Sequence, residues 1–264
     1  MPFVERGAYR LHYRVAGSAD APPLLLVMGL GMCSLAWHTL PARLAARFRV
    51  LAVDNRGVGG STAARGGFRI GDLAEDAAGV LDAERVARAH VFGISMGGMI
   101  AQELALRHPE RVRALALGAT FGGHWRSRKP GVGVALDLAL AALLARSVPR
   151  MARLLVSEAF YAGHRDGFAT WLGGISRAPR AVARRQILAI ARHEAESRLG
   201  ALRVPTLVLT GDRDRLVPPE NSRRLARVIP GARLVELPGA GHAFPFERPD
   251  ETVRLLTEHF LAAP

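Results

Sequence analysis

The feature that most constrains this fold is an alternation of short, continuously apolar runs with segments of helical periodicity. Continuous hydrophobicity is typical of strands that are covered on both faces. In the first part of the chain these runs are Pro23 to Met28, Arg49 to Val53, His90 to Ile94 and Val112 to Gly118. Helical patterns lie between them at Ser34 to Phe48, Ile70 to Val86 and Met96 to His108. This order predicts βαβ units, and hence a mainly parallel sheet with helices on both faces.

Both ends of the chain add strands to this pattern. Phe3-Val4 and Tyr9 to Val15 have the period-two alternation of a hairpin. Near the C-terminus, strand character returns at Pro205 to Thr210 and Ala232 to Leu237, and helical patterns follow at Pro219 to Val228 and Pro249 to Leu261. The sequence therefore offers eight candidate strands for one central sheet.

Residues 121–200 carry no strand pattern. Their helical segments are Val134 to Arg146, Pro149 to Phe160, Asp166 to Leu172 and Arg180 to Leu199. An all-helical block inserted between two stretches of α/β alternation predicts a cap over the sheet. We therefore expect a core made of residues 1–120 and 201–264, and a helical cap made of residues 121–200.

Composition excludes several classes of protein. A chain of 264 residues with 49% hydrophobic and 22% charged side chains can bury one sizeable core. Its single cysteine, Cys33, excludes an internal disulfide and a four-cysteine zinc site. No apolar run has the length of a signal-peptide core or of a membrane span. We expect a cytoplasmic protein with no membrane partner and no metal.

The net charge of +13 raises the question of nucleic acid. The basic residues are arginines apart from Lys129, and residues 121–200 contain thirteen basic against five acidic side chains. No stacking aromatics interleave with these arginines and no nucleic-acid motif occurs, so no nucleic-acid partner is expected. Two interpretations of the basic cap stay open, a solvated arginine-rich face and a positive rim that attracts anionic substrates.

The strongest local motif surrounds Ser95. An apolar strand runs directly into Gly93-Ile-Ser-Met-Gly97 and then into a helix. A serine at such a sharp strand-to-helix turn has its hydroxyl pushed out of the sheet, and the flanking glycines remove side chains that would collide with the turn. Ser95 is therefore a candidate nucleophile.

A serine hydroxyl needs a base, and the base needs a group that orients it. Two aspartates, Asp212 and Asp214, follow the strand that ends near Thr210. His242 lies in the glycine loop after the last strand. Serine, acid and histidine thus follow three strands in that chain order, at the carboxyl edge where open α/β sheets place their sites.

From about residue 8 to the C-terminus the chain resembles the α/β-hydrolase superfamily, specifically capped single-domain members such as 3-oxoadipate enol-lactonases and methylesterases. The segments that carry the resemblance are Met28-Gly-Leu-Gly31, Asp54-Asn-Arg-Gly-Val-Gly59-Gly-Ser61, Gly93-Ile-Ser-Met-Gly97, Gly211-Asp-Arg-Asp214 with Val217-Pro218, and Gly241-His242. The fold that this resemblance implies is the α/β-hydrolase fold, a mainly parallel eight-stranded sheet with an inserted helical cap. The Asp54 to Ser61 segment would be a structural turn.

The resemblance also implies roles for individual residues. Ser95 would be the nucleophile, His242 the general base and Asp214 the acid that orients it, with Asp212 as the local alternative. The oxyanion hole would consist of the backbone N–H groups of Met96 and Leu30. Many relatives have His-Gly where this chain has Met28-Gly29.

A serine nucleophile implies acyl transfer to water and needs no metal or organic cofactor. The expected substrate is a small, partly apolar ester or lactone, hydrolysed through an acyl-enzyme on Ser95. Methionine fills irregular gaps, so Met28 and Met99, together with Phe244, are expected to line an apolar pocket. Two alternatives are a cofactor-free perhydrolase or other acyl transferase, and a ligand-binding protein without turnover.

Overall fold

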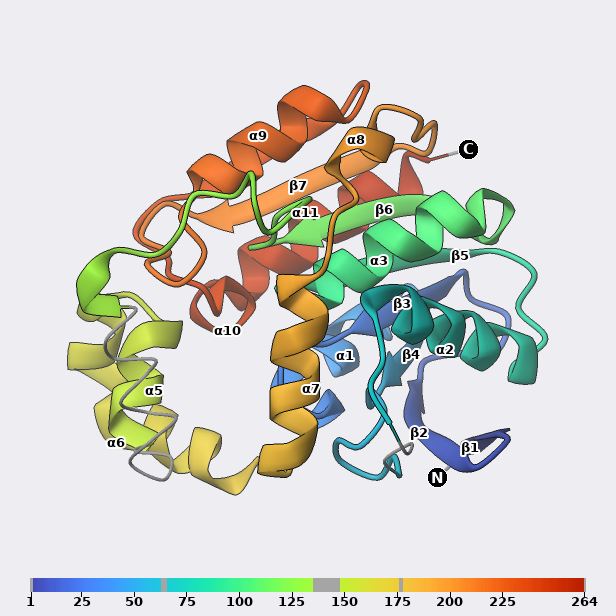
Figure 1. The fold of residues 1–264 in the computed structure, drawn as a ribbon, viewed down its shortest axis with the longest axis horizontal. Helices are drawn as coiled ribbons and strands as arrows, with labels where there is room; N and C mark the ends of the chain where they lie inside the picture. The colour runs from blue at the N-terminus through green and yellow to red at the C-terminus, as the bar shows by residue number, and fades with distance from the viewer. Residues whose placement is uncertain (1, 63–65, 135–147, 176–177, 264) are drawn as a thin grey trace.

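The computed structural model describes residues 2–62, 66–134, 148–175 and 178–263. An eight-stranded sheet with the order β1-β2-β4-β3-β5-β6-β7-β8 lies at its centre (Figure 1). β1 pairs with β2 and β2 with β4 in antiparallel fashion, and the remaining neighbours are parallel. The strands are β1 (Phe3–Arg6), β2 (Tyr9–Ala16), β3 (Pro23–Val27), β4 (Arg49–Val53), β5 (Ala89–Ile94), β6 (Val112–Gly118), β7 (Thr206–Gly211) and β8 (Arg233–Leu237). The predicted eight-stranded, mainly parallel sheet is confirmed.

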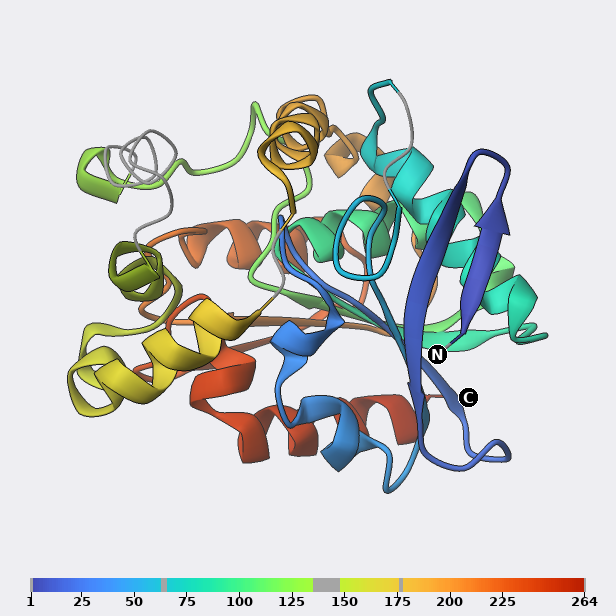
Figure 2. The ribbon, with the colours of Figure 1, turned by 90° about the horizontal axis from the view of Figure 1, so that it is seen from below.

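Helices cover both faces of this sheet, as Figure 2 shows in a view along its edge. One face packs against α2 (Ile70–Ala83), α3 (Met96–Arg107) and α9 (Glu220–Val228). The other packs against α1 (Leu40–Leu44) and α11 (Pro249–Leu261). Alternate strand residues divide between the two layers: Leu25 and Val27 join the first, Leu24 and Leu26 the second. Burial on both faces explains why the strands are continuously apolar.

The helices between β6 and β7 begin and end at other residues than their periodicity predicts. They are α5 (Val148–Leu155), α6 (Glu158–Gly174), α7 (Arg180–Ala191) and α8 (Glu196–Leu199). α6 is longer than the predicted Asp166 to Leu172, and the predicted Arg180 to Leu199 is divided in two. Ser157 separates α5 from α6 because its Oγ accepts a hydrogen bond from Phe160 N (3.3 Å) and so caps a new helix. A bridge between Gly123 and Glu194 separates α7 from α8. Of the helix predicted at Val134 to Arg146, residues 135–146 lie outside the described residues.

A second predicted helix, Ser34 to Phe48, is also interrupted. It consists of the 3-10 turn η1 (Ser34–Trp37) and of α1, and His38 between them has a φ of 52°. A positive φ cannot continue a right-handed helix, so the chain turns there. The remaining short elements are η2 (Pro109–Arg111) and α10 (Phe244–Glu247).

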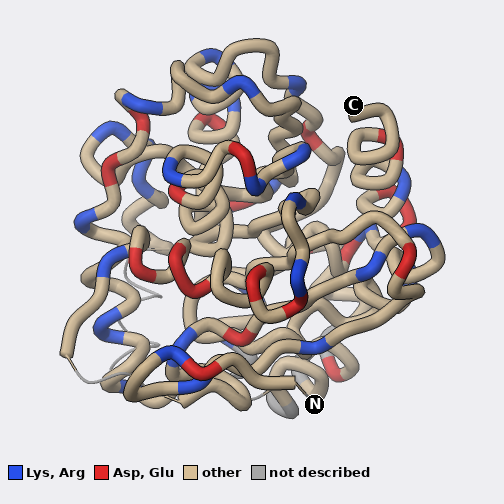
Figure 3. The backbone as a smooth tube through the Cα atoms, turned by 90° about the vertical axis from the view of Figure 1, so that its right-hand side faces the viewer, with Lys and Arg blue, Asp and Glu red and all other residues tan. Residues whose placement is uncertain are grey.

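Three further observations concern hydrophobicity, charge and metal-ligating side chains. No helix in the described part of the chain is long and apolar enough to cross a membrane. On the side of the molecule drawn in Figure 3, basic and acidic segments are interspersed and do not gather into one stripe. Within the described ranges, no cluster of three or more His, Cys, Asp or Glu could hold a metal ion.

A buried histidine links the β5 strand to the C-terminal helix. The His90 ring lies between Phe48 and Phe260, with ring centroids 5.9 and 4.9 Å away. Burial lowers the pKa of His90 to about 4, and the charge of Arg113 contributes in the same direction. In the unfolded chain a histidine has a pKa of about 6.5. Below that pH the unfolded state binds a proton that the native state does not, so native stability falls as the pH drops from about 6.5 towards 4.

We therefore expect a His90→Phe variant to lose less stability on acidification. Between pH 7 and pH 5 the free energy of unfolding should decrease by about 2 kcal/mol less in the variant than in the wild type. Urea titrations at the two pH values measure this difference. Equal pH dependence in wild type and His90→Phe would contradict the assignment.

Candidate active site

Ser95 occupies a strained turn between β5 and α3. Its φ of 58° and ψ of −124° are unusual for a residue with a side chain. Ser95 N donates to Gly118 O at the end of β6, at 2.8 Å, which pins the turn to the neighbouring strand. The half-buried Ser95 side chain thus starts at the carboxyl edge of the sheet.

The glycines around Ser95 are required by close backbone contacts. A Cβ on Gly93 would lie 2.1 Å from Gly97 O, and a Cβ on Gly97 would lie 2.0 Å from Val27 O. Real Cβ atoms essentially never approach a backbone oxygen so closely. The Gly-x-Ser-x-Gly pattern therefore lets β5, α3 and the end of β3 meet without side chains between them.

The loop at residues 28–31, which follows β3, packs directly against Ser95. A Cβ built on Gly29 would lie 3.1 Å from Ser95 Cβ and 3.6 Å from Ser95 Oγ. Asn55 Nδ2 donates to Met28 O at 2.9 Å and holds the loop from behind. Leu30 follows Gly29, the residue of this loop that lies next to Ser95. Met96, which begins α3, is fully buried.

His242 contacts Asp214 and not Asp212. His242 Nδ1 lies 2.8 Å from Asp214 Oδ2, and both residues are buried. The other oxygen of Asp214 accepts the backbone N–H groups of Leu216 (2.9 Å) and Val217 (2.8 Å). Asp212 Oδ1 instead accepts Gly239 N at 2.7 Å. Of the two aspartates, Asp214 is therefore the one that can orient the imidazole.

Sheet topology places these side chains at one edge. Ser95, Asp214 and His242 follow β5, β7 and β8, which belong to the parallel part of the sheet. The carboxyl ends of parallel strands share an edge. A Cβ on Gly118 would lie 3.1 Å from the Phe244 ring, and Gly118 O is the acceptor for Ser95 N. The loop that carries His242 and the Ser95 turn therefore flank the same glycine.

Glu247 fixes the histidine loop, and no sequence motif marks it. Its Oε1 accepts Gly241 N at 2.7 Å and its Oε2 accepts Ser157 Oγ at 2.7 Å. Burial raises the pKa of this carboxyl, and the hydrogen bonds from Ser157 and Gly241 oppose that rise. Ala243 N also donates to Leu155 O at 2.6 Å. The His242 loop is thus bonded on both sides to the junction of α5 and α6.

The segment after β4 has the structural role that its resemblance implies. Asp54 Oδ1 accepts Ser34 N at 2.6 Å, and its Oδ2 lies 2.7 Å from His12 Nδ1. Oδ2 also accepts Gly60 N at 2.9 Å. These bonds tie three separate parts of the chain to one buried carboxylate behind the 28–31 loop.

Comparison with known proteins agrees with this geometry. A model of the alpha/beta hydrolase family matches residues 24–255. The chain belongs to the alpha/beta hydrolase family. Among curated relatives, the protein named "Putative carbamate hydrolase RutD" of Variovorax paradoxus is 36% identical over 88% of this chain and 89% of its own. The protein named "Putative non-heme bromoperoxidase BpoC" of Mycobacterium tuberculosis is 31% identical over 95% of this chain and 97% of its own.

A solved structure supports the same assignment to the alpha/beta hydrolase family. The enol-lactonase from Burkholderia xenovorans superposes with a TM-score of 0.87. It is 29% identical and covers 98% of this chain and 99% of its own. The comparison therefore covers nearly the whole length of both chains.

In this alpha/beta hydrolase, the three residues predicted to line a pocket pack in two different layers. Met28, Met99 and Phe244 are all buried. Met28 and Phe244 pack in the layer with α1 and α11, whereas Met99 packs in the layer with α2 and α3. The sheet separates the two layers. Sequence spacing placed Met99 near Ser95, but its helical position turns it towards the core.

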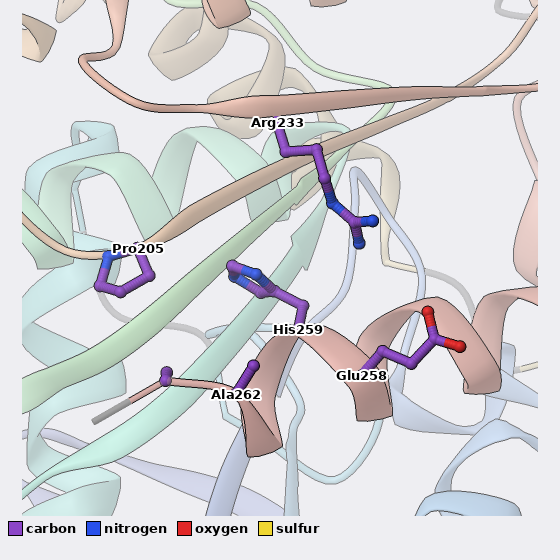
Figure 4. A pocket seen from close by; sticks show the side chains of 6 residues that line it. Pro205, Arg233, Glu258, His259 and Ala262 are labelled. Atoms are coloured by element: carbon purple, nitrogen blue, oxygen red, sulfur yellow. The ribbon is translucent and has the colours of Figure 1, made fainter.

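A cavity of about 260 Å³ lies at the opposite end of this hydrolase (Figure 4). Pro205, Arg233 and His259 contribute to its lining. Pro205 precedes β7 and Arg233 begins β8, so the cavity is at the amino edge of the sheet. It is separate from the edge that carries Ser95.

Proposed function

We propose that this chain is a serine hydrolase that cleaves carboxylic esters or lactones of small, partly apolar molecules. The observation that carries the proposal is a strained serine that touches the 28–31 loop at the sheet edge shared with a buried Asp214–His242 pair. The alpha/beta hydrolase family and the likeness to an enol-lactonase structure support the same chemistry.

In the proposed cycle, Ser95 is the nucleophile, His242 is the general base and Asp214 orients His242. With its Nδ1 proton directed at Asp214, His242 keeps Nε2 free to take the proton of the Ser95 hydroxyl. Ser95 Oγ bonds to the substrate carbonyl carbon, and the leaving oxygen departs with the proton returned by His242. Water then gives one proton to His242 and bonds to the acyl carbon. As the bond from that carbon to Ser95 Oγ breaks, His242 returns the proton to Oγ, which releases the acid and restores the serine.

The negative charge of the tetrahedral intermediates would rest on backbone donors. The N–H of Met96 begins α3, where the helix adds a partial positive charge. The N–H of Leu30 would come from the 28–31 loop, and the closeness of Gly29 to Ser95 supports this role. Because the donors are backbone groups, methionine at position 28 is compatible with this role.

An apolar cluster next to both loops supports partly apolar substrates. In this cluster, Cys33 and Val58 of the core pack together with Val156, which lies between α5 and α6, and with Phe168 of α6. Met32 and Ala243, each close in sequence to a catalytic loop, pack against it. We infer that acyl or alcohol groups of short to medium length would occupy this side of the site.

A panel of p-nitrophenyl esters from acetate to decanoate tests the proposal. We expect turnover above background at short to medium chain lengths, because longer chains exceed what the cluster can cover. Absorbance of released p-nitrophenol measures the rate, and heat-denatured protein provides the blank. Absence of turnover at every chain length would contradict the proposal and favour a ligand-binding protein, which titration with the products would then test.

A second candidate is perhydrolysis, and it is favoured by the relative named as a bromoperoxidase. In this reaction hydrogen peroxide replaces water on the acyl-enzyme, and a peracid leaves. The peracid then oxidises bromide. Bromination of a dye in acetate, peroxide and bromide, compared with ester hydrolysis by the same preparation, distinguishes the two reactions.

A further inference from the structure

The helix α7 carries a buried glutamine that is bonded to the 28–31 loop. Gln186 has no exposed surface, and its Oε1 accepts Gly31 N at 2.8 Å. Gly31 O in turn accepts Ala178 N at 2.9 Å. Both backbone groups of Gly31 are therefore held by the segment that leads into α7 and by α7 itself, which lies in front of β3 in Figure 1.

The amide nitrogen of Gln186, Nε2, has no acceptor among the described residues. Nε2 is buried and donates no hydrogen bond. Leaving a buried donor unpaired costs about 1–3 kcal/mol, so such a group calls for an explanation. The amide cannot be turned round to avoid the problem, because the Gly31 N–H must face the oxygen.

The position of this donor points to the substrate. Val182 and Ala189, which share the inward face of α7 with Gln186, are apolar and cannot accept its hydrogen bond. Oε1 and Nε2 are attached to the same carbon, so Nε2 lies next to the bond to Gly31. Gly31 adjoins Leu30, the proposed oxyanion donor. The unpaired N–H therefore belongs to the side chain that holds the loop of the proposed oxyanion donor.

We propose that Gln186 Nε2 is a substrate-binding donor, which selects esters or lactones with a second carbonyl oxygen close to the scissile one. The inference rests on the proposed function. A site with a buried unpaired donor rejects substrates that lack the matching acceptor, since the donor then stays unsatisfied. Substrates with the second carbonyl should consequently bind more tightly than otherwise identical ones without it.

Two matched pairs of esters test this selectivity. Ethyl 3-oxohexanoate with ethyl hexanoate places the extra carbonyl on the acyl side, and 2-oxopropyl butanoate with propyl butanoate places it on the alcohol side. Calorimetric Kd values are measured in a Ser95→Ala background, so that binding is read without turnover. In at least one pair the oxo ester should bind roughly tenfold more tightly.

Variants at position 186 separate the donor from the contact with Gly31. Gln186→Glu keeps an oxygen for Gly31 N and removes the amide donor, so the ratio of Kd values should fall to about one. Gln186→Met removes both and should also abolish the ratio. Ile187→Glu places the same carboxylate on the half-exposed outer side of α7 and should leave the ratio unchanged.

Equal binding within both pairs by the Ser95→Ala protein would overturn the inference, and so would a ratio that survives Gln186→Glu. Either result would leave Gln186 with the loop contact alone. Because this readout needs no catalysis, failure of the wild-type protein to hydrolyse any ester would contradict the proposed function and would not prevent the binding test from deciding the role of Gln186.

Discussion

A Ser95→Ala variant is expected to hydrolyse p-nitrophenyl esters at least about 10⁴-fold more slowly than the wild type. The alanine removes the Ser95 hydroxyl, which lies beside Gly29, so no acyl-enzyme can form at this turn. Initial rates under substrate saturation measure the loss in kcat. Labelling with a fluorophosphonate should give one adduct on the wild type, located at Ser95 by peptide mass spectrometry, and none on the variant.

The control for this prediction is Ser18→Ala, which removes a hydroxyl from an exposed turn and should retain both the rate and the label. A fluorophosphonate adduct that persists on Ser95→Ala would assign the nucleophile to another residue. A loss in kcat smaller than about 100-fold would argue against an acyl-enzyme on Ser95.

The second large effect is expected for Asp214→Asn, with a decrease in kcat of about 10⁴-fold. Asparagine keeps an oxygen for the N–H groups of Leu216 and Val217, so the loop should fold as before. Its amide would donate to Nδ1 of His242, which moves the imidazole proton to Nε2. An imidazole in that tautomer cannot take the proton of the Ser95 hydroxyl.

Asp212→Asn is the matched control, since Asp212 accepts from Gly239 and does not contact His242. Its kcat should stay within about threefold of the wild type, in line with an ordinary surface substitution. Thermal unfolding of both variants shows whether either effect comes from lost structure. A large loss for Asp212→Asn with little change for Asp214→Asn would reverse the assignment of the acid.

The sheet was predictable because each strand is a continuous apolar run with helical patterns beside it. Helix ends were less predictable. Periodicity alone does not detect the Ser157 cap between α5 and α6, nor the positive φ of His38 that ends η1. Both breaks depend on hydrogen bonds or backbone angles that leave the hydrophobic pattern unchanged.

The candidate site, too, could be predicted from the sequence only in part. Chain order and strand ends predicted Ser95, His242 and a nearby aspartate; the resemblance favoured Asp214 over Asp212, and the observed contact with His242 supports that choice. Glu247 and Gln186 escaped prediction because their roles depend on partners far away in the chain. Glu247 bonds to a residue 90 positions away, and Gln186 to one 155 positions away. No local pattern encodes such pairings.

The close contacts around Gly93 and Gly97 have a consequence for protein engineering. Any side chain at either position would meet a backbone oxygen at about 2 Å, and backbone cannot move aside as a flexible side chain can. Randomised libraries that include these positions would consist mainly of misfolded clones. Variation directed at the inward face of α7 instead would alter substrate choice while the turn that holds Ser95 remains intact.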